Sequence, residues 1–171
     1  MLQKLSALQP KDYLTLANAA SGTLSIVAAV AGISWFWLLI PLALLFDWLD
    51  GWFARFSKTQ NKIGVQLDSL ADIISFGVAP FIAAIVLVGA SAMILVAGIL
   101  FVLAGVIRLA HFNLAKPAKT YSGLPVTGGA VIALLFILVD VMTGDGGQIA
   151  SLALFVLAFL EISEIRFPSL K

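Results

Sequence analysis

The sequence contains no cysteine, so disulfide bonds and zinc sites built from thiolates are excluded. Charged residues are also scarce, at 11% of the chain, whereas a soluble domain averages about 25%. The formal net charge of +1 gives no indication of nucleic-acid binding. Instead, 61% of the residues are hydrophobic and the mean hydropathy is +1.09. This composition indicates that lipid, rather than water, surrounds most of the chain.

Apolar stretches long enough to cross a bilayer recur six times along the chain. The hydrocarbon core of a bilayer is about 30 Å thick and requires about 20 helical residues. Turn-forming residues such as Gly32, Gly89 and Gly144 separate the stretches. The predicted helices are Leu14–Ala31, Trp35–Arg55, Ile63–Val88, Ala92–His111, Val126–Met142 and Ile149–Ile165. The predicted fold is therefore all-α, a six-helix transmembrane bundle that forms one membrane domain over residues 1–171.

The basic residues orient this predicted bundle. Short loops rich in lysine and arginine stay in the cytoplasm. All ten basic residues fall at one face: Lys4, Lys11, Arg55, Lys58, Lys62, Arg108, Lys116, Lys119, Arg166 and Lys171. Both termini are thus predicted to be cytoplasmic in a multi-pass protein of the cell membrane. That arrangement requires an even number of spans, in agreement with the six found from hydropathy.

Residues 1–12 precede the first predicted helix and are too polar for a cleavable signal peptide. We interpret them as an interfacial lead-in, with Leu2, Leu5 and Leu8 on the side that contacts the membrane surface. A disordered stub is the alternative interpretation.

Four of the nine acidic residues gather in one segment of the chain, at Asp47, Asp50, Asp68 and Asp72. Asp47 and Asp50 are three residues apart near the end of the second predicted helix. Gly64, Asp68 and Asp72 are spaced by four residues on the third. Each spacing places its side chains on one face of a helix. Because a short connection joins the two helices, the two acidic faces can meet at the same depth.

Carboxylates clustered in a membrane protein are unfavourable, since even one at the bilayer centre costs about 2.5–3.5 kcal/mol. Divalent cations would offset this cost, and carboxylate oxygens suit Mg²⁺ or Mn²⁺. Two such ions could polarise the attacking and leaving oxygens of a phosphoryl substrate. Gly51, Ala54 and Gly64 lie on the same faces and would let a ligand approach the backbone. The alternative is that the four acids are solvated near helix ends and paired with neighbouring basic residues.

The segment from Asp47 to Asp72 reads D-x2-D-G-x2-A-R-x8-G-x3-D-x3-D. This pattern resembles the signature of the CDP-alcohol phosphotransferase family at every fixed position. Members of that family have six transmembrane helices and are commonly homodimers. They transfer an alcohol-linked phosphate from a CDP-alcohol to a hydroxyl acceptor and release CMP. The resemblance covers nearly the whole chain and implies a membrane-embedded transferase.

The resemblance also implies roles for individual residues. Asp47, Asp50, Asp68 and Asp72 would hold two divalent cations, Mg²⁺ or Mn²⁺, and Asp72 would also be the catalytic base. The positions that would receive the CDP-lipid are Asn18, Gly51, Ala54, Arg55 and Gly64.

The second half of the motif and several segments outside it are similar to those of the phosphatidylserine synthase and archaetidylserine synthase subfamily. They are the segments 14–18, 67–80, 108–113 and 123–125. The similarity implies L-serine as the acceptor and either CDP-diacylglycerol or CDP-archaeol as the donor. Arg108 would then bind the serine carboxylate, with His111 and Asn113 beside it, although many relatives have arginine where this chain has His111. An arginine that merely reaches the membrane interface is the alternative for Arg108.

Other activities are compatible with parts of this pattern. Inositol phosphate or glycerol phosphate could be the acceptor, but both are doubly anionic and would require more cations than this chain offers outside the motif. An intramembrane prenyltransferase also uses aspartates and metals, but with other spacings and more helices. A divalent-cation transporter would need acids spread through the depth of the membrane.

The remaining acids near the helix ends are expected to play no part in the site. Asp140 and Asp145 fall on the outer side and are predicted to be solvated. Glu161 and Glu164, near the inner end of the sixth helix, are predicted to pair with Arg166 or another basic residue.

Overall fold

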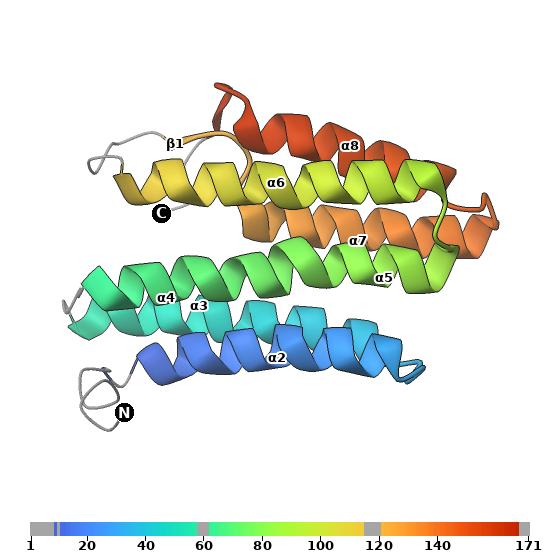
Figure 1. Ribbon diagram of the computed structural model, residues 1–171. Helices are drawn as coiled ribbons and strands as arrows, with labels where there is room; N and C mark the ends of the chain where they lie inside the picture. The colour runs from blue at the N-terminus through green and yellow to red at the C-terminus, as the bar shows by residue number, and fades with distance from the viewer. Residues whose placement is uncertain (1–8, 10, 58–61, 115–120, 168–171) are drawn as a thin grey trace.

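The computed structural model describes residue 9 and the ranges 11–57, 62–114 and 121–167. Within these ranges the chain folds into six helical rods that run side by side along a common direction (Figure 1). The third rod is continuous but built from three elements, α4, the π-helical segment η2 and α5. A short 3-10 turn, η1, precedes α3. The helical elements are α2 (Asp12–Val30), η1 (Phe36–Leu38), α3 (Leu39–Ser57), α4 (Lys62–Asp72), η2 (Ile73–Val78), α5 (Ala79–Val88), α6 (Ala92–Leu114), α7 (Val126–Thr143) and α8 (Gln148–Ile162).

Five of the six predicted spans are confirmed as helices long and apolar enough to cross a membrane: Asp12–Val30, Phe36–Ala54, Ile63–Val88, Ala92–Leu114 and Val126–Thr143. The sixth rod, α8, is apolar but has only 15 residues. Its predicted end at Ile165 was wrong, because the backbone becomes extended at Ser163. The strand β2 (Arg166–Phe167) then pairs antiparallel with β1 (Tyr121–Ser122). The all-α bundle is otherwise as predicted, and the cytoplasmic placement of the termini stays a prediction.

Small residues allow the helices to approach closely, as is usual in membrane proteins. Alanines fill much of the interior, and the ring of Phe81 lies directly over Gly98, where a Cβ atom would overlap it. Larger side chains such as Phe76, Phe101 and Leu154 are fully buried between the rods. α2 packs mainly on α3, and α6 on α8. The bundle therefore consists of tightly packed rods whose exposed surface is largely apolar.

The π-helical segment η2 follows directly after Asp72. Pro80 lacks a backbone N–H, so it cannot bond to the carbonyl one α-helical turn before it. The Ala79 N–H instead bonds to the carbonyl of Ile74, five residues earlier. Inside η2, the Ser75 hydroxyl donates to the carbonyl oxygen of Asn18 at 3.0 Å, where Gly22 leaves room for Ser75 against α2. The widened turn thus fixes the third rod against α2 next to the acidic motif.

At the opposite end of the bundle, Asp140 is buried, with 1% of its surface exposed. The prediction that it is solvated was wrong, because its carboxylate caps the start of α8. It accepts hydrogen bonds from the backbone N–H groups of Gly147 at 2.9 Å and Ala150 at 2.8 Å. A negative charge at this position also interacts favourably with the helix dipole. Asp145 is exposed, as predicted, and accepts a bond from the Thr143 hydroxyl at 3.1 Å.

We expect Asp140→Ala to lower the free energy of unfolding by about 1–2 kcal/mol, because two backbone N–H groups lose their acceptor. Reversible unfolding of the purified protein in mixed micelles measures this change. Asp145→Ala is the matched control and should stay within about 0.5 kcal/mol of the unsubstituted protein. Equal stability of the two variants would contradict the capping role.

Candidate active site

Carboxylates from two neighbouring rods converge at one end of the bundle. Asp47 lies on α3, whereas Asp68 and Asp72 lie on α4. One carboxylate oxygen from each of the three lies within 4.8 Å of the other two. Asp47 and Asp68 are half-buried and Asp72 is buried. The two acidic faces therefore meet at one depth, as their spacing in the sequence predicts.

Asp50, the fourth acid of the motif, lies beside this group but is turned toward α2. Its Oδ2 accepts a hydrogen bond from the hydroxyl of Thr15, and its side chain is buried. It remains close enough to Asp47 and Asp68 to interact with both electrostatically. The structure thus groups three of the four predicted ligands most closely, and the metal-binding role of all four stays a prediction.

Asn18 positions Asp72. It lies on α2, is completely buried, and donates from Nδ2 to Oδ1 of Asp72 at 3.2 Å. The bond from Ser75 to the Asn18 backbone holds the same part of α2 in place. One oxygen of Asp72 is therefore engaged by a neutral amide, and its orientation is set by the packing of α2 on the third rod.

The polar face of α2 is the part of the site that sequence reasoning largely missed, since it named only Asn18. Thr15, Ser21 and Ser25 are buried on the same side of the helix. Asp12 is also buried, near Asp50, and accepts a bond from the backbone N–H of Gln9 at 2.8 Å. The signal that could have found these residues is the recurrence of polar side chains every three or four positions along an otherwise apolar helix.

The donor set of this cluster fits a divalent cation. It consists of carboxylate oxygens, which hard ions such as Mg²⁺ and Mn²⁺ prefer. Asp47, Asp68 and Asp72 repel one another in a site with little access to water, so a cation would offset an unfavourable arrangement. The cluster is therefore compatible with metal binding.

The small residues of the motif surround the acids. Gly51 is exposed, and a Cβ atom added there would meet nothing within 4 Å, so the surface beside Asp50 is open. Ala54 is half-buried and Gly64 is buried. The side chain of Arg55 lies outside the described part of the structure. The predicted contacts of these positions with a CDP-lipid stay predictions.

The three residues predicted to bind serine lie on α6 but differ in their surroundings. Arg108 is half-buried and interacts electrostatically with Asp72 and Glu161. Asn113 exchanges hydrogen bonds with Ser69 at 3.0 and 3.2 Å, which ties α6 to α4. His111 is exposed, and its Nδ1 lies 2.9 Å from the carbonyl oxygen of Ile107 on its own helix. Of the three, Arg108 is thus the one placed toward the acidic cluster.

A cleft between α3 and α7 has one acid of the cluster, Asp47, in its lining. Its volume is about 510 Å³, and it is lined by Pro41, Leu44, Leu45, Asp47, Trp48 and Thr127. Pro41 and Leu44 also line a second, apolar cleft of about 250 Å³ that continues between the same helices past Trp37 to Leu138. A path with one acidic end and one apolar end suits an amphipathic molecule.

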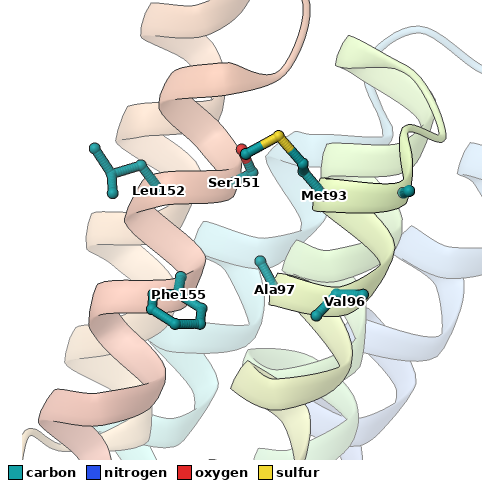
Figure 2. Close-up of a pocket in the computed structure, with 7 residues that line it drawn as sticks. Met93, Val96, Ala97, Ser151, Leu152 and Phe155 are labelled. Carbon is teal, nitrogen blue, oxygen red and sulfur yellow. The ribbon is translucent and has the colours of Figure 1, made fainter.

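A separate groove lies between the first turns of α6 and α8, at the end of the bundle away from the acids (Figure 2). Its volume is about 470 Å³, and its lining is apolar apart from Ser151, whose hydroxyl donates to the carbonyl of Gln148 in its own helix. Met93 and Phe155 are among the lining residues. No Asp, Glu, His, Lys or Arg is among the described residues that line it.

Comparison with known proteins agrees with the geometry of the site. Residues 11–162 match the family model of the CDP-alcohol phosphatidyltransferases. This match covers more than half of the chain and includes every acid of the cluster. The chain therefore belongs to the CDP-alcohol phosphatidyltransferase family.

Several curated relatives are more than a third identical to this chain over the residues that align. An archaetidylserine synthase of Methanothermobacter thermautotrophicus is 39% identical over 168 residues, which are 92% of this chain and 68% of the relative. A CDP-diacylglycerol–serine O-phosphatidyltransferase of Methanocaldococcus jannaschii is 35% identical over 159 residues, or 92% of this chain and 72% of the relative. One of the same name from Helicobacter pylori is 35% identical over 144 residues, or 79% of this chain and 60% of the relative.

Binding of Mn²⁺ to the purified protein tests the metal fit. We expect Asp68→Asn to weaken binding at least about tenfold, because a charged ligand becomes neutral. Electron paramagnetic resonance of free Mn²⁺ during a titration measures the affinity without any substrate. Asp145→Asn removes an exposed carboxylate at the other end of the bundle and should leave the affinity unchanged. If both variants bind Mn²⁺ as the unsubstituted protein does, the cluster is not the metal site.

Proposed function

We propose that this protein transfers a phosphatidyl or archaetidyl group from a CDP-activated lipid to the hydroxyl of L-serine and releases CMP. The observation that carries the proposal is the convergence of Asp47, Asp68 and Asp72 at one end of a membrane bundle. Family membership supports the type of chemistry, and the names of the relatives support serine as the acceptor. Either CDP-diacylglycerol or CDP-archaeol is the donor.

The proposed cofactors are two divalent cations, Mg²⁺ or Mn²⁺, held by Asp47, Asp50, Asp68 and Asp72. When bound, they would supply positive charge to the donor's phosphates and to the leaving CMP. The grouping of three carboxylates within 4.8 Å supports this assignment. Asp50 would complete the ligand set from its place beside the group.

The CDP-lipid is proposed to lie across the motif, with its nucleotide near Gly51, Ala54 and Gly64 and its pyrophosphate near Arg55. The open surface beside Gly51 supports this placement. The cleft between α3 and α7 begins at Asp47 and continues into an apolar space, so it suits the lipid chains of the same molecule. Asn18 is proposed to belong to the same CDP-lipid site, and its hydrogen bond to Asp72 supports this assignment.

Asp72 is proposed to act as the base. It accepts the proton of the serine hydroxyl, whose oxygen forms a bond to the lipid-linked phosphorus while the bond from that phosphorus to the CMP oxygen breaks. CMP leaves with the electrons of that bond. Since the Asn18 amide engages Oδ1 of Asp72, the other oxygen is the one available to the hydroxyl. General bases of this kind contribute about 10²–10⁴-fold to a rate.

The site is proposed to face the cytoplasm of the cell in which the protein is made, and the protein is proposed to act as a homodimer. Among the described basic residues, Lys11 is near Asp50 and Arg108 is near Asp72, and segments rich in such residues stay cytoplasmic. The dimer rests on the family resemblance, and the mass of the protein in detergent tests it.

Labelling of single cysteines tests the orientation, because the native chain contains none. Both Glu164 and Ser91 are exposed. Glu164 follows the end of α8, whereas Ser91 is in the turn between α5 and α6, and Figure 1 shows these two segments at opposite ends of the bundle. We expect a membrane-impermeant maleimide added to intact cells to label the Ser91→Cys variant and to spare the Glu164→Cys variant until the cells are opened. The reverse pattern would contradict a cytoplasmic site.

An acceptor panel tests the function. Purified protein is given CDP-diacylglycerol or CDP-archaeol, Mn²⁺ or Mg²⁺, and one of serine, inositol phosphate or glycerol phosphate. We expect CMP release with serine and a serine-containing lipid product detected by mass spectrometry. CMP release with inositol phosphate alone would refute serine as the acceptor but would still support phosphotransferase activity.

Two variants serve as arms of the same assay. Asp72→Asn keeps the size of the side chain but removes its basicity, so CMP release should fall at least about 10²-fold. Asp145→Asn, at the far end of the bundle, should leave the rate unchanged. Near-normal turnover of Asp72→Asn would refute the base assignment.

A further inference from the structure

Glu161, in the last turn of α8, is the most unusual polar side chain outside the motif. It points into the bundle and has only 1% of its surface exposed. Among the described residues, neither of its carboxylate oxygens has a hydrogen-bond partner, although both are buried. The expected pairing with a basic residue is therefore not made through a direct hydrogen bond. A carboxylate buried without a partner is costly, so this position calls for a ligand that completes it.

Two glycines make room for this carboxylate. A Cβ atom at Gly129 of α7 would stand 2.7 Å from Oε1 of Glu161. A Cβ atom at Gly105 of α6 would stand 3.5 Å from Oε2. The carboxylate thus projects between α6 and α7. The closest approach is at Gly129, which has no side chain to crowd it. A bulkier residue at Gly129 would displace it.

Arg108 is near both Glu161 and Asp72. It is one helical turn beyond Gly105 on α6 and interacts electrostatically with both Glu161 and Asp72. Its Nε is buried and has no hydrogen-bond partner among the described residues. The guanidinium and the Glu161 carboxylate therefore face the same region and both retain hydrogen-bonding capacity. In a purely structural ion pair, the Arg108 guanidinium would donate hydrogen bonds directly to the Glu161 carboxylate.

A free amino acid carries the two groups that complement Glu161 and Arg108. It carries an ammonium with three N–H donors and a carboxylate with two acceptor oxygens on a single carbon. A guanidinium binds a carboxylate through two parallel hydrogen bonds, and a buried carboxylate accepts from an ammonium. Serine carries a hydroxyl one carbon further along, and Asp72, the proposed base for that hydroxyl, is near Arg108.

We propose that Glu161 binds the α-ammonium of the amino-acid acceptor while Arg108 binds its α-carboxylate. This inference rests on the proposed function and adds to it the residue that selects a zwitterion. A doubly anionic acceptor such as a sugar phosphate offers no cation to Glu161 and is repelled by it. Glu161 is thus a specificity-determining residue that arrives from the last helix, far from the motif in the sequence.

The experiment compares Glu161→Gln with Glu164→Gln, an exposed glutamate three residues later. In the CMP-release assay we expect Glu161→Gln to raise the KM for serine at least about tenfold, because a charge-assisted contact is lost. The KM for the CDP-lipid should stay within about twofold. Glu164→Gln should leave both values unchanged. If the two variants behave alike while the unsubstituted protein uses serine, the inference is overturned and the function stands.

A second acceptor separates recognition from a structural effect. 3-Hydroxypropanoate is serine without its ammonium group. The unsubstituted protein should prefer serine strongly in kcat/KM, and Glu161→Gln should reduce that preference at least about tenfold. A merely structural role would lower the activity toward both acceptors equally and leave the preference intact. Absence of any reaction with serine in the unsubstituted protein would instead refute the proposed function, and this inference with it.

A measurement on the unsubstituted protein keeps the inference testable if Glu161→Gln does not fold. L-Alanine has the ammonium and carboxylate of serine but no hydroxyl, and propanoate lacks the ammonium as well. L-Alanine should inhibit competitively with serine, and propanoate should inhibit at least about tenfold more weakly. Equal inhibition by the two would show that no group of the site binds the ammonium.

Discussion

The mutual repulsion of carboxylates in a poorly solvated space is the constraint on which the rest of this structure depends. Asp47, Asp68 and Asp72 are brought together by two antiparallel rods, and nothing in an apolar bundle favours that arrangement by itself. The surrounding elements limit how far the acids can move apart. α3 and the third rod both pack on α2, and Asn18 and Thr15 supply neutral donors to Asp72 and Asp50. The packing of the helices therefore holds the three carboxylates together, in an arrangement that is compatible with cation binding.

The polar face of α2 contributes to the acidic site, although the motif lies entirely on the next two rods. Its side chains donate hydrogen bonds to Asp50 and Asp72. Neutral hydroxyl and amide groups can donate to a carboxylate without adding a charge to the site, so they orient Asp50 and Asp72 and leave the charge of the site to the acids and to any bound cation. The π-helical segment η2, which follows Asp72, also fixes the position of this acid relative to α2. It accommodates Pro80 and places Ser75 against α2, so the segment that carries Asp72 is held at two points.

The sequence predicted the parts of this molecule that follow from periodicity. Spacings of three and four residues placed Asp47 with Asp50 and Asp68 with Asp72, and hydropathy located five of the six spans. It could not predict contacts between distant helices. Thr15 and Asp50 are 35 residues apart, and Glu161 meets Gly129 and Gly105 only because α8 packs beside α6 and α7. Asp140 was misjudged for the same reason, since its acceptor role depends on where α8 begins.

The brevity of α8 has a consequence for the membrane itself. Its 15 residues rise about 22 Å at 1.5 Å per residue, several ångströms less than an average hydrocarbon layer. A short span is accommodated by local thinning of the bilayer or by polar residues that reach toward the headgroups. At the end of α8 the chain leaves the helix at Ser163 and soon pairs as a strand, so no further helical turn extends this span. Under the proposed function, a thinner bilayer at α8 would shorten the path of a small soluble acceptor to the acids, whereas a lipid donor would reach them from the bilayer through the cleft beside Asp47.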